Sequence, residues 1–151
     1  MDASFSHGLW PPKLSSLAIG GLKKPISEWG PQSFPTSLVD LHLVGGPSEA
    51  VSNFSQMSHL LPSSLTSLGI IGFEKVESVS MGLQHLTSLQ KLDIWDCPKV
   101  RDLPEKLLPS LLRLHIMRCP ILEGKIIKGG SYWPLVSWIP STIYWSVTKL
   151  V

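Results

Sequence analysis

Two cysteines and five histidines are the first side chains of this sequence to consider as zinc ligands or as catalytic groups. A zinc site usually joins four such ligands, in pairs spaced as Cys-x-x-Cys or as two histidines on one helical turn. Cys97 and Cys119 form no Cys-x-x-Cys pair, and no two histidines have the helical spacing. The sequence therefore predicts no metal site. The cysteines are expected to be small buried thiols, with a reactive pair or a metal site as the minor alternative.

Sequence motifs of catalysis and nucleotide binding are also missing. The serines form no G-x-S-x-G elbow. No G-x-x-x-x-G-K-[ST] loop occurs, because Gly124-Lys125 lacks both the preceding glycine and the following hydroxyl residue. We therefore expect no enzyme activity, no cofactor and no bound nucleotide.

Composition narrows the function classes further. The 151 residues suffice for one domain, and hydrophobic residues make up 43% of them, a globular balance. The 13 basic and 11 acidic residues nearly balance, and the resulting net charge of +2 is too small to favour nucleic acid or an anionic membrane as a partner. The first residues lack a signal-peptide pattern, and prolines and polar residues interrupt the apolar end. We expect a soluble chain in a reducing intracellular compartment, the cytoplasm or alternatively the nucleus.

The cysteines belong to a frame of apolar residues that recurs along the chain. LQKLDIWDCP at residues 89–98 and LLRLHIMRCP at residues 111–120 share the shape L-x-x-L-x-I-x-x-C-P. The last two apolar positions alternate as on a strand buried on one face, and proline or Ser/Thr pairs precede each copy. Five copies of the frame occur, at Leu14-Leu17-Ile19, Leu38-Leu41-Leu43, Leu65-Leu68-Ile70, Leu89-Leu92-Ile94 and Leu111-Leu114-Ile116.

A single short strand cannot bury its apolar face alone, so the copies must stack into one parallel sheet over one core. This spacing, with a period of roughly 20–29 residues, is typical of leucine-rich repeats. The predicted fold class is α/β: a leucine-rich-repeat solenoid shaped as a horseshoe arc. A short-stranded parallel β-sheet forms its concave face, and mostly irregular coil with short helical turns forms its convex face.

We expect a single domain over residues 1–151, with about five repeats and a C-terminal cap over about residues 122–151. A helical turn is expected near residues 81–85. The repeats start near Leu14, Leu38, Leu65, Leu89 and Leu111, and the strands are expected at 16–20, 40–44, 67–71, 91–95 and 113–117.

Further markers lie between the repeats and near the end of the chain. They are Cys97-Pro98, Cys119-Pro120, Leu103-Pro104 and a tail of the form G-x-Y-W-P-x-x-x-x-I-P made of Gly130, Tyr132, Trp133, Pro134, Ile139 and Pro140. In these markers the chain resembles the C-terminal leucine-rich repeats of plant intracellular disease-resistance proteins of the coiled-coil, nucleotide-binding type. The resemblance covers roughly residues 10–140. It departs from the family at Ile126 and Ile127, where a charged stretch is usual, and in the apolar end STIYWSVTKLV.

The resemblance implies a protein-protein interaction module in plant innate immunity. Its partner would be a pathogen effector or the nucleotide-binding module of a resistance protein, the latter through an autoinhibitory contact. Three alternatives stay open. One is a substrate-recruiting repeat domain of an F-box ubiquitin ligase, and another is a truncated fragment without independent function. The third, a secreted receptor ectodomain, is disfavoured by the missing signal peptide.

The frame also predicts where a partner binds, because side chains beside the buried positions face outward. On the first three predicted strands these outward residues are mostly small. The fourth and fifth carry charges, an exposed tryptophan and a methionine, a composition typical of interaction hot spots. A solvated face with Asp93 pairing to His115 and Asp96 to Arg118 is the alternative. The candidate protein-binding residues are Lys91, Asp93, Trp95, Asp96, Arg113, His115, Met117 and Arg118.

Overall fold

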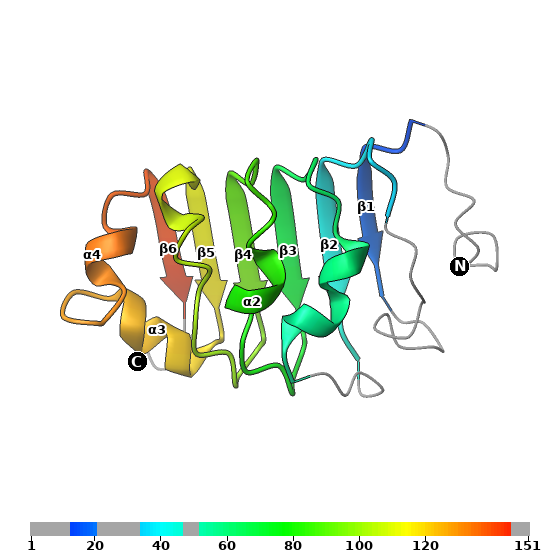
Figure 1. Ribbon diagram of the computed structural model, residues 1–151. Coiled ribbons are helices and arrows are strands. Elements are labelled where there is room, and N and C mark those ends of the chain that lie inside the picture. Colours follow the sequence, from blue (N-terminus) through cyan, green and yellow to red (C-terminus); the bar gives the residue numbers. More distant parts are fainter. Residues whose placement is uncertain (1–12, 21–33, 47–51, 146–151) are drawn as a thin grey trace.

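Six short strands form one parallel sheet, and their order in the sheet is their order in the sequence (Figure 1). The computed structural model describes residues 13–20, 34–46 and 52–145. The α/β class and the parallel sheet that the sequence predicts are confirmed. The strands are β1 (Ser16–Ile19), β2 (Asp40–Val44), β3 (Ser67–Ile71), β4 (Lys91–Trp95), β5 (Arg113–Met117) and β6 (Ser141–Trp145).

The recurring frame determines how these strands align. Leu41 lies beside Leu17 and Leu68, and the same row continues through Leu92 to Leu114. The predicted bounds are confirmed for β2 to β5, whereas β1 ends one residue early, at Ile19. A slip of one residue would turn every apolar side chain to the other face, so the buried pattern holds the register.

The core lies on one side of the sheet. The inward rows from β2 to β5 are almost completely buried, as are the leucines at the turn before each strand. Leu17 on β1 is only partly buried and packs against the edge of the core. The rows are Leu41, Leu68, Leu92 and Leu114, then Leu43, Ile70, Ile94 and Ile116, with Leu38, Leu65, Leu89 and Leu111 at the turns.

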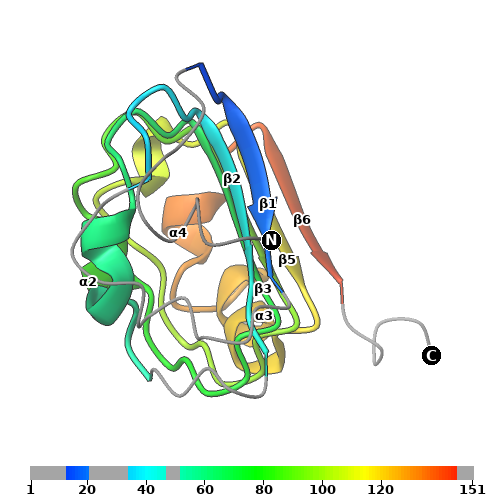
Figure 2. The same cartoon turned by 90° about the vertical axis from the view of Figure 1, so that its right-hand side faces the viewer.

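Short helices and irregular segments cover this core, as the sequence predicts. The helices of the described residues all lie on one side of the sheet, and the described elements leave its other face open (Figure 2). The predicted turn near residues 81–85 is α2. The helical segments are the 3-10 helices η2 (Phe54–Leu60) and η3 (Leu108–Ser110) and the α-helices α2 (Ser80–Leu83), α3 (Pro120–Ile126) and α4 (Trp133–Val136).

The strand β6 is a feature that the sequence analysis missed. The segment expected to be only a cap contains most of α3, all of α4, and this sixth strand. Thr142 and Tyr144 take the places next to Leu114 and Ile116. The segment follows the i, i+3, i+5 spacing from Ile139 onward, but with Thr and Tyr in place of leucine. Its β-branched and aromatic residues favour a strand even though the leucine pattern is lost.

Candidate functional site

The open face of the sheet, which is the face away from the helices, carries the residues that the sequence proposes as a site. Leu92, Ile94, Leu114 and Ile116 point into the core, so the alternate residues of β4 and β5 point outward. The register brings together the outward pairs Lys91 and Arg113, Asp93 and His115, and Trp95 and Met117.

Asp93 lies at the centre of this group and is nearly buried, with 6% of its side chain exposed. Its Oδ2 accepts a hydrogen bond of 2.8 Å from Nη2 of Arg113. Its Oδ1 lies 3.9 Å from Nδ1 of His115 and is buried without a hydrogen-bond partner. The contact between Asp93 and His115, which the alternative of a solvated face predicts, is therefore secondary, because Arg113 lies closer to the carboxylate than His115 does.

His115 lies between Asp93 and the edge of the sheet. Its Nε2 is 3.5 Å from the hydroxyl of Ser141 on β6. Burial lowers the pKa of His115 below its ordinary value of 6.5, because a buried site disfavours the charged imidazolium. Asp93 opposes this shift and the positive charge of Arg113 adds to it. His115 is therefore mainly neutral at neutral pH.

Trp95 differs from its sequence-based description as an exposed residue. It lies between Ile71 and Met117 in the register and is only partly exposed. Its indole Nε1 is buried and has no hydrogen-bond partner among the described residues. The place of Trp95 between two strands that carry Ile71 and Met117 at the same level accounts for the difference.

Asp96 and Arg118 follow β4 and β5 in equivalent positions and form the ion pair that the alternative of a solvated face predicts. Nε of Arg118 donates to Oδ1 of Asp96 at 2.5 Å, and Nη2 donates to Oδ2 at 3.3 Å. Both residues have a positive φ, 55° and 56°, which Gly72 also has after β3. This left-handed conformation favours glycine and is tolerated by aspartate, whereas it strains a residue such as Arg118. The pair borders a hollow of about 530 Å³ that Glu74, Lys75, Pro98 and Lys99 also line.

The site extends onto β2 and β3, which the sequence analysis did not foresee. A hollow of about 340 Å³ opens where the strands begin, and Asp40, His42, Gln90, Lys91 and Arg113 are among its lining residues. Asp40 accepts a hydrogen bond of 3.1 Å from the hydroxyl of Ser16. Asp40 and His42 occupy outward positions of the second predicted strand. These polar residues are the sequence signal from which the site could have been extended to β2.

Gly69 leaves space for His42, one of the residues that line this hollow. A Cβ built on Gly69 would lie 2.2 Å from Cδ2 of His42, so the imidazole occupies the space over the glycine. Nδ1 of His42 lies 3.4 Å from Oδ1 of Asp40. The missing side chain of Gly69 on β3 thus allows the imidazole of His42 on β2 to lie over it.

Cys97 and Cys119 are free, fully buried thiols one strand apart. The Sγ of Cys119 donates to the carbonyls of Ile94 and Met117, both at 3.3 Å. Cys97 makes the same two contacts one strand earlier, with Ile70 and Trp95. A side-chain hydrogen bond with Cys97, together with burial, raises the pKa of Cys119. The thiols satisfy backbone acceptors inside the core, as expected for structural cysteines.

Asp102 is a polar centre on the helix side that no sequence motif indicated. Its carboxylate accepts hydrogen bonds from the hydroxyls of Ser78 and Ser80, at 2.6 and 2.7 Å, and from the backbone N–H groups of Val79 and Ser80. We call each strand together with the segment that leads to the next strand a unit. Asp102 follows β4 and thus caps the start of α2, which belongs to the preceding unit. It borders a hollow of about 330 Å³, but its oxygens are already occupied by these bonds.

Comparisons with protein-family models, with curated proteins and with solved structures find no match for this chain. Across residues 13–20, 34–46 and 52–145, no three His, Cys, Asp or Glu side chains gather as metal ligands would. None of the helices in that part of the chain combines the length and the apolar character that spanning a membrane requires.

Proposed function

We propose that the chain is a leucine-rich-repeat solenoid that binds another protein through the open face of its sheet, at β4 and β5. Its function would be that of the C-terminal repeats of intracellular plant disease-resistance proteins. The partner would be a pathogen effector or the nucleotide-binding module of a resistance protein. The repeated register of the leucine rows supports the repeat assignment. A location in the cytoplasm or nucleus belongs to the same proposal.

One observation carries the binding part: a nearly buried carboxylate sits on a sheet face that no described element covers. Charged groups are rarely buried unless they are paired. Asp93 is held between Arg113 and His115, with Trp95 and Met117 alongside. Oriented charges beside a partly buried tryptophan and a methionine are the composition of a protein-binding hot spot.

The outward residues of the first and third strands give an internal comparison. Ser16, Ala18, Ser67 and Gly69 are small and leave β1 and β3 without such a cluster. A face that served only to contact water would have no need of this difference between strands. The large and charged outward side chains are most numerous on β4 and β5, with Asp40 and His42 on β2 beside them, and this uneven distribution supports a binding site centred on β4 and β5.

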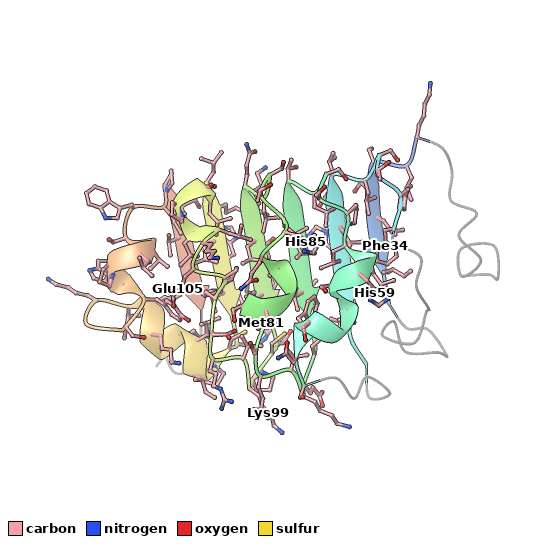
Figure 3. The ribbon with its side chains drawn as sticks, in the orientation of Figure 1. Phe34, His59, Met81, His85, Lys99 and Glu105 are labelled. Carbon is pink, nitrogen blue, oxygen red and sulfur yellow. The ribbon has the colours of Figure 1, made fainter. Side chains whose placement is uncertain are left out.

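The test measures binding to the nucleotide-binding module of a coiled-coil-type resistance protein and to effectors by titration calorimetry. Lys91→Glu reverses an exposed charge without touching the core, and Trp95→Ala removes the proposed anchor. Each change should weaken binding at least about tenfold. Met81→Ala is the matched control, because Met81 is exposed on α2, on the opposite side (Figure 3).

Circular dichroism and thermal unfolding of each variant establish that the fold is kept. If Lys91→Glu and Trp95→Ala leave the affinity within about twofold while Met81→Ala lowers it, the binding site is on the helix side. The proposal is then wrong about the face. If none of the tested modules or effectors binds, it is wrong about the partner.

A further inference from the structure

The end of the molecule formed by α4 and β6 has a second feature, which is independent of the open face. β6 is the last strand of the sheet, so only one of its two edges pairs with β5. Among the described residues its outer edge has no strand partner. An unpaired edge offers a row of backbone donors and acceptors to another chain.

The direction of these backbone groups follows from one hydrogen bond. The N–H of Ser141 donates to the carbonyl of Leu112 at 3.1 Å, so Ser141 faces β5. In a parallel sheet successive residues turn their backbone groups to opposite sides. The N–H and C=O groups of Thr142 and Tyr144 therefore point away from β5, out of the sheet.

This edge lacks the usual protection against pairing. Natural edge strands often carry lysine, proline or another charge that prevents association. The residues of β6 are Ser, Thr, Ile, Tyr and Trp, and residues 129–148 contain no Asp, Glu, Lys, Arg or His. A stretch of this length without charge is unusual in a chain of which 16% is charged, and its described part, residues 129–145, includes all of α4 and β6.

Exposed apolar side chains lie at the same end. Trp138 is 86% exposed and Leu135 40% exposed. The hydroxyl of Thr142 donates to the carbonyls of Val136 and Ile139, at 3.3 and 3.4 Å, which ties β6 to α4 and the turn after it. The helix and the strand lie side by side at this end in Figure 1. A large exposed tryptophan next to an unpaired edge favours association over solvation.

We propose that this end binds a second copy of the chain, with β6 pairing antiparallel to β6 of the copy. A twofold axis brings the same edge of both copies together, and this contact closes as a dimer. The outward donors and acceptors of Thr142 and Tyr144 then meet their own equivalents. Because α4 and β6 carry no charged side chain, these two elements of two copies meet without repulsion, whereas a strongly charged partner would gain nothing from them.

The first test is the mass of the chain in solution, measured by sedimentation over a range of concentrations. The expected result is a monomer–dimer equilibrium. Tyr144→Pro removes an outward N–H and keeps the bonds to β5, because proline is tolerated at an edge. Trp138→Lys leaves the strand untouched and adds a charge at the contact. Each should raise the dissociation constant at least about tenfold, and Met81→Lys on α2 should not.

The second test, amide hydrogen exchange, stays informative if Tyr144→Pro disturbs the strand. In the unaltered chain, the amides of Thr142 and Tyr144 should become protected as concentration rises. The amides of Ile143 and Trp145, which face β5, should be protected at all concentrations. A monomer at every concentration, or fast exchange at Thr142 and Tyr144 throughout, overturns the proposal. Masses growing past the dimer overturn it too, since they indicate open head-to-tail stacking.

Discussion

Asp93 illustrates at the residue scale how the site depends on a single charge. Its carboxylate is nearly buried, and Arg113 is its only hydrogen-bond donor among the described side chains. Asp93→Ala should destabilise the chain by about 1–3 kcal/mol, because the guanidinium loses a buried partner. Urea unfolding followed by circular dichroism measures this change.

The ion pair of Asp96 and Arg118 provides the control for that prediction. It has equivalent charges but is largely exposed, with 42% and 54% of the two side chains accessible. Asp96→Asn removes the charge but keeps a residue that tolerates the positive φ of 55° at this position, so it should leave stability nearly unchanged, because exposed pairs contribute little. Equal losses from Asp93→Ala and Asp96→Asn would contradict the central role of the buried carboxylate.

His115 should make stability depend on pH in a defined direction. Its folded pKa is lowered below 6.5, so between these two values the unfolded chain binds a proton that the folded chain does not. Its contribution to stability is therefore complete above pH 6.5 and is lost as the pH falls toward the folded pKa. His115→Gln should reduce the loss of stability between about pH 7.5 and 5.5.

Urea midpoints of the unaltered chain and the variant at both pH values make this comparison. Asp93, Arg113 and Ser141 face the imidazole, and all three are kept in the variant. A pH dependence that is the same with and without His115 would assign the effect to other groups.

At the scale of elements, Asp102 shows that one unit of the chain completes the next. Asp102→Ala would leave two hydroxyls and two backbone N–H groups at the start of α2 without their acceptor. The expected loss is about 1–2 kcal/mol. The amides of Val79 and Ser80 should also exchange faster with solvent.

Glu105→Ala is the matched control for the cap, because Glu105 is an exposed acid of the same loop on the helix side (Figure 3). Unchanged exchange at Val79 and Ser80 in Asp102→Ala would show that α2 does not depend on this cap. Faster exchange in both variants would indicate a general effect of removing negative charge.

The spacing of apolar residues in the sequence predicted most of the strands, but it did not predict the contacts between one strand with its connecting segment and the next. Leucines at i and i+3, followed by Leu or Ile at i+5, located β2 to β5 because each strand buries those side chains itself. β6 was missed because Thr142 and Tyr144 replace the pattern while keeping its geometry. The cap by Asp102 reaches α2 from more than twenty positions along the sequence, and no local pattern encodes such a distance.

The same limit applies to the site. Alternation along β4 and β5 identified the outward residues, because the direction of a side chain on a strand is a local property. The dominant contact of Asp93 with Arg113 and the depth of Trp95 depend on neighbouring strands. The position of His42 depends on an absent side chain at Gly69. To predict these contacts, one must know how neighbouring strands align as well as the order of residues within a single strand.

At the scale of the whole molecule, the buried thiols report how the sheet opens. Cys97 and Cys119 lie in the core next to different strands, and both are inaccessible. Ellman's reagent should react slowly with the folded chain and quickly with both thiols after denaturation, because attack requires an exposed thiolate.

The single variants Cys97→Ser and Cys119→Ser test whether opening is cooperative. If the units around β4 and β5 open together, the remaining thiol should react at the same rate in either variant. A faster reaction at one thiol would show that the sheet opens unit by unit, as arrays with contacts only between neighbours allow.

The register between β3 and β4 has a consequence for the length of the chain. Ser67 and Lys91 occupy equivalent places on adjacent strands, and so do the residues after them. A deletion of residues 67–90 would join Thr66 directly to Lys91, at a junction whose geometry the sheet already contains. A duplication of the same segment would insert one more strand at an equally compatible point. A gene that encodes such strands can therefore gain or lose one strand with its connecting segment at a time. Each such insertion or deletion changes which outward side chains become neighbours.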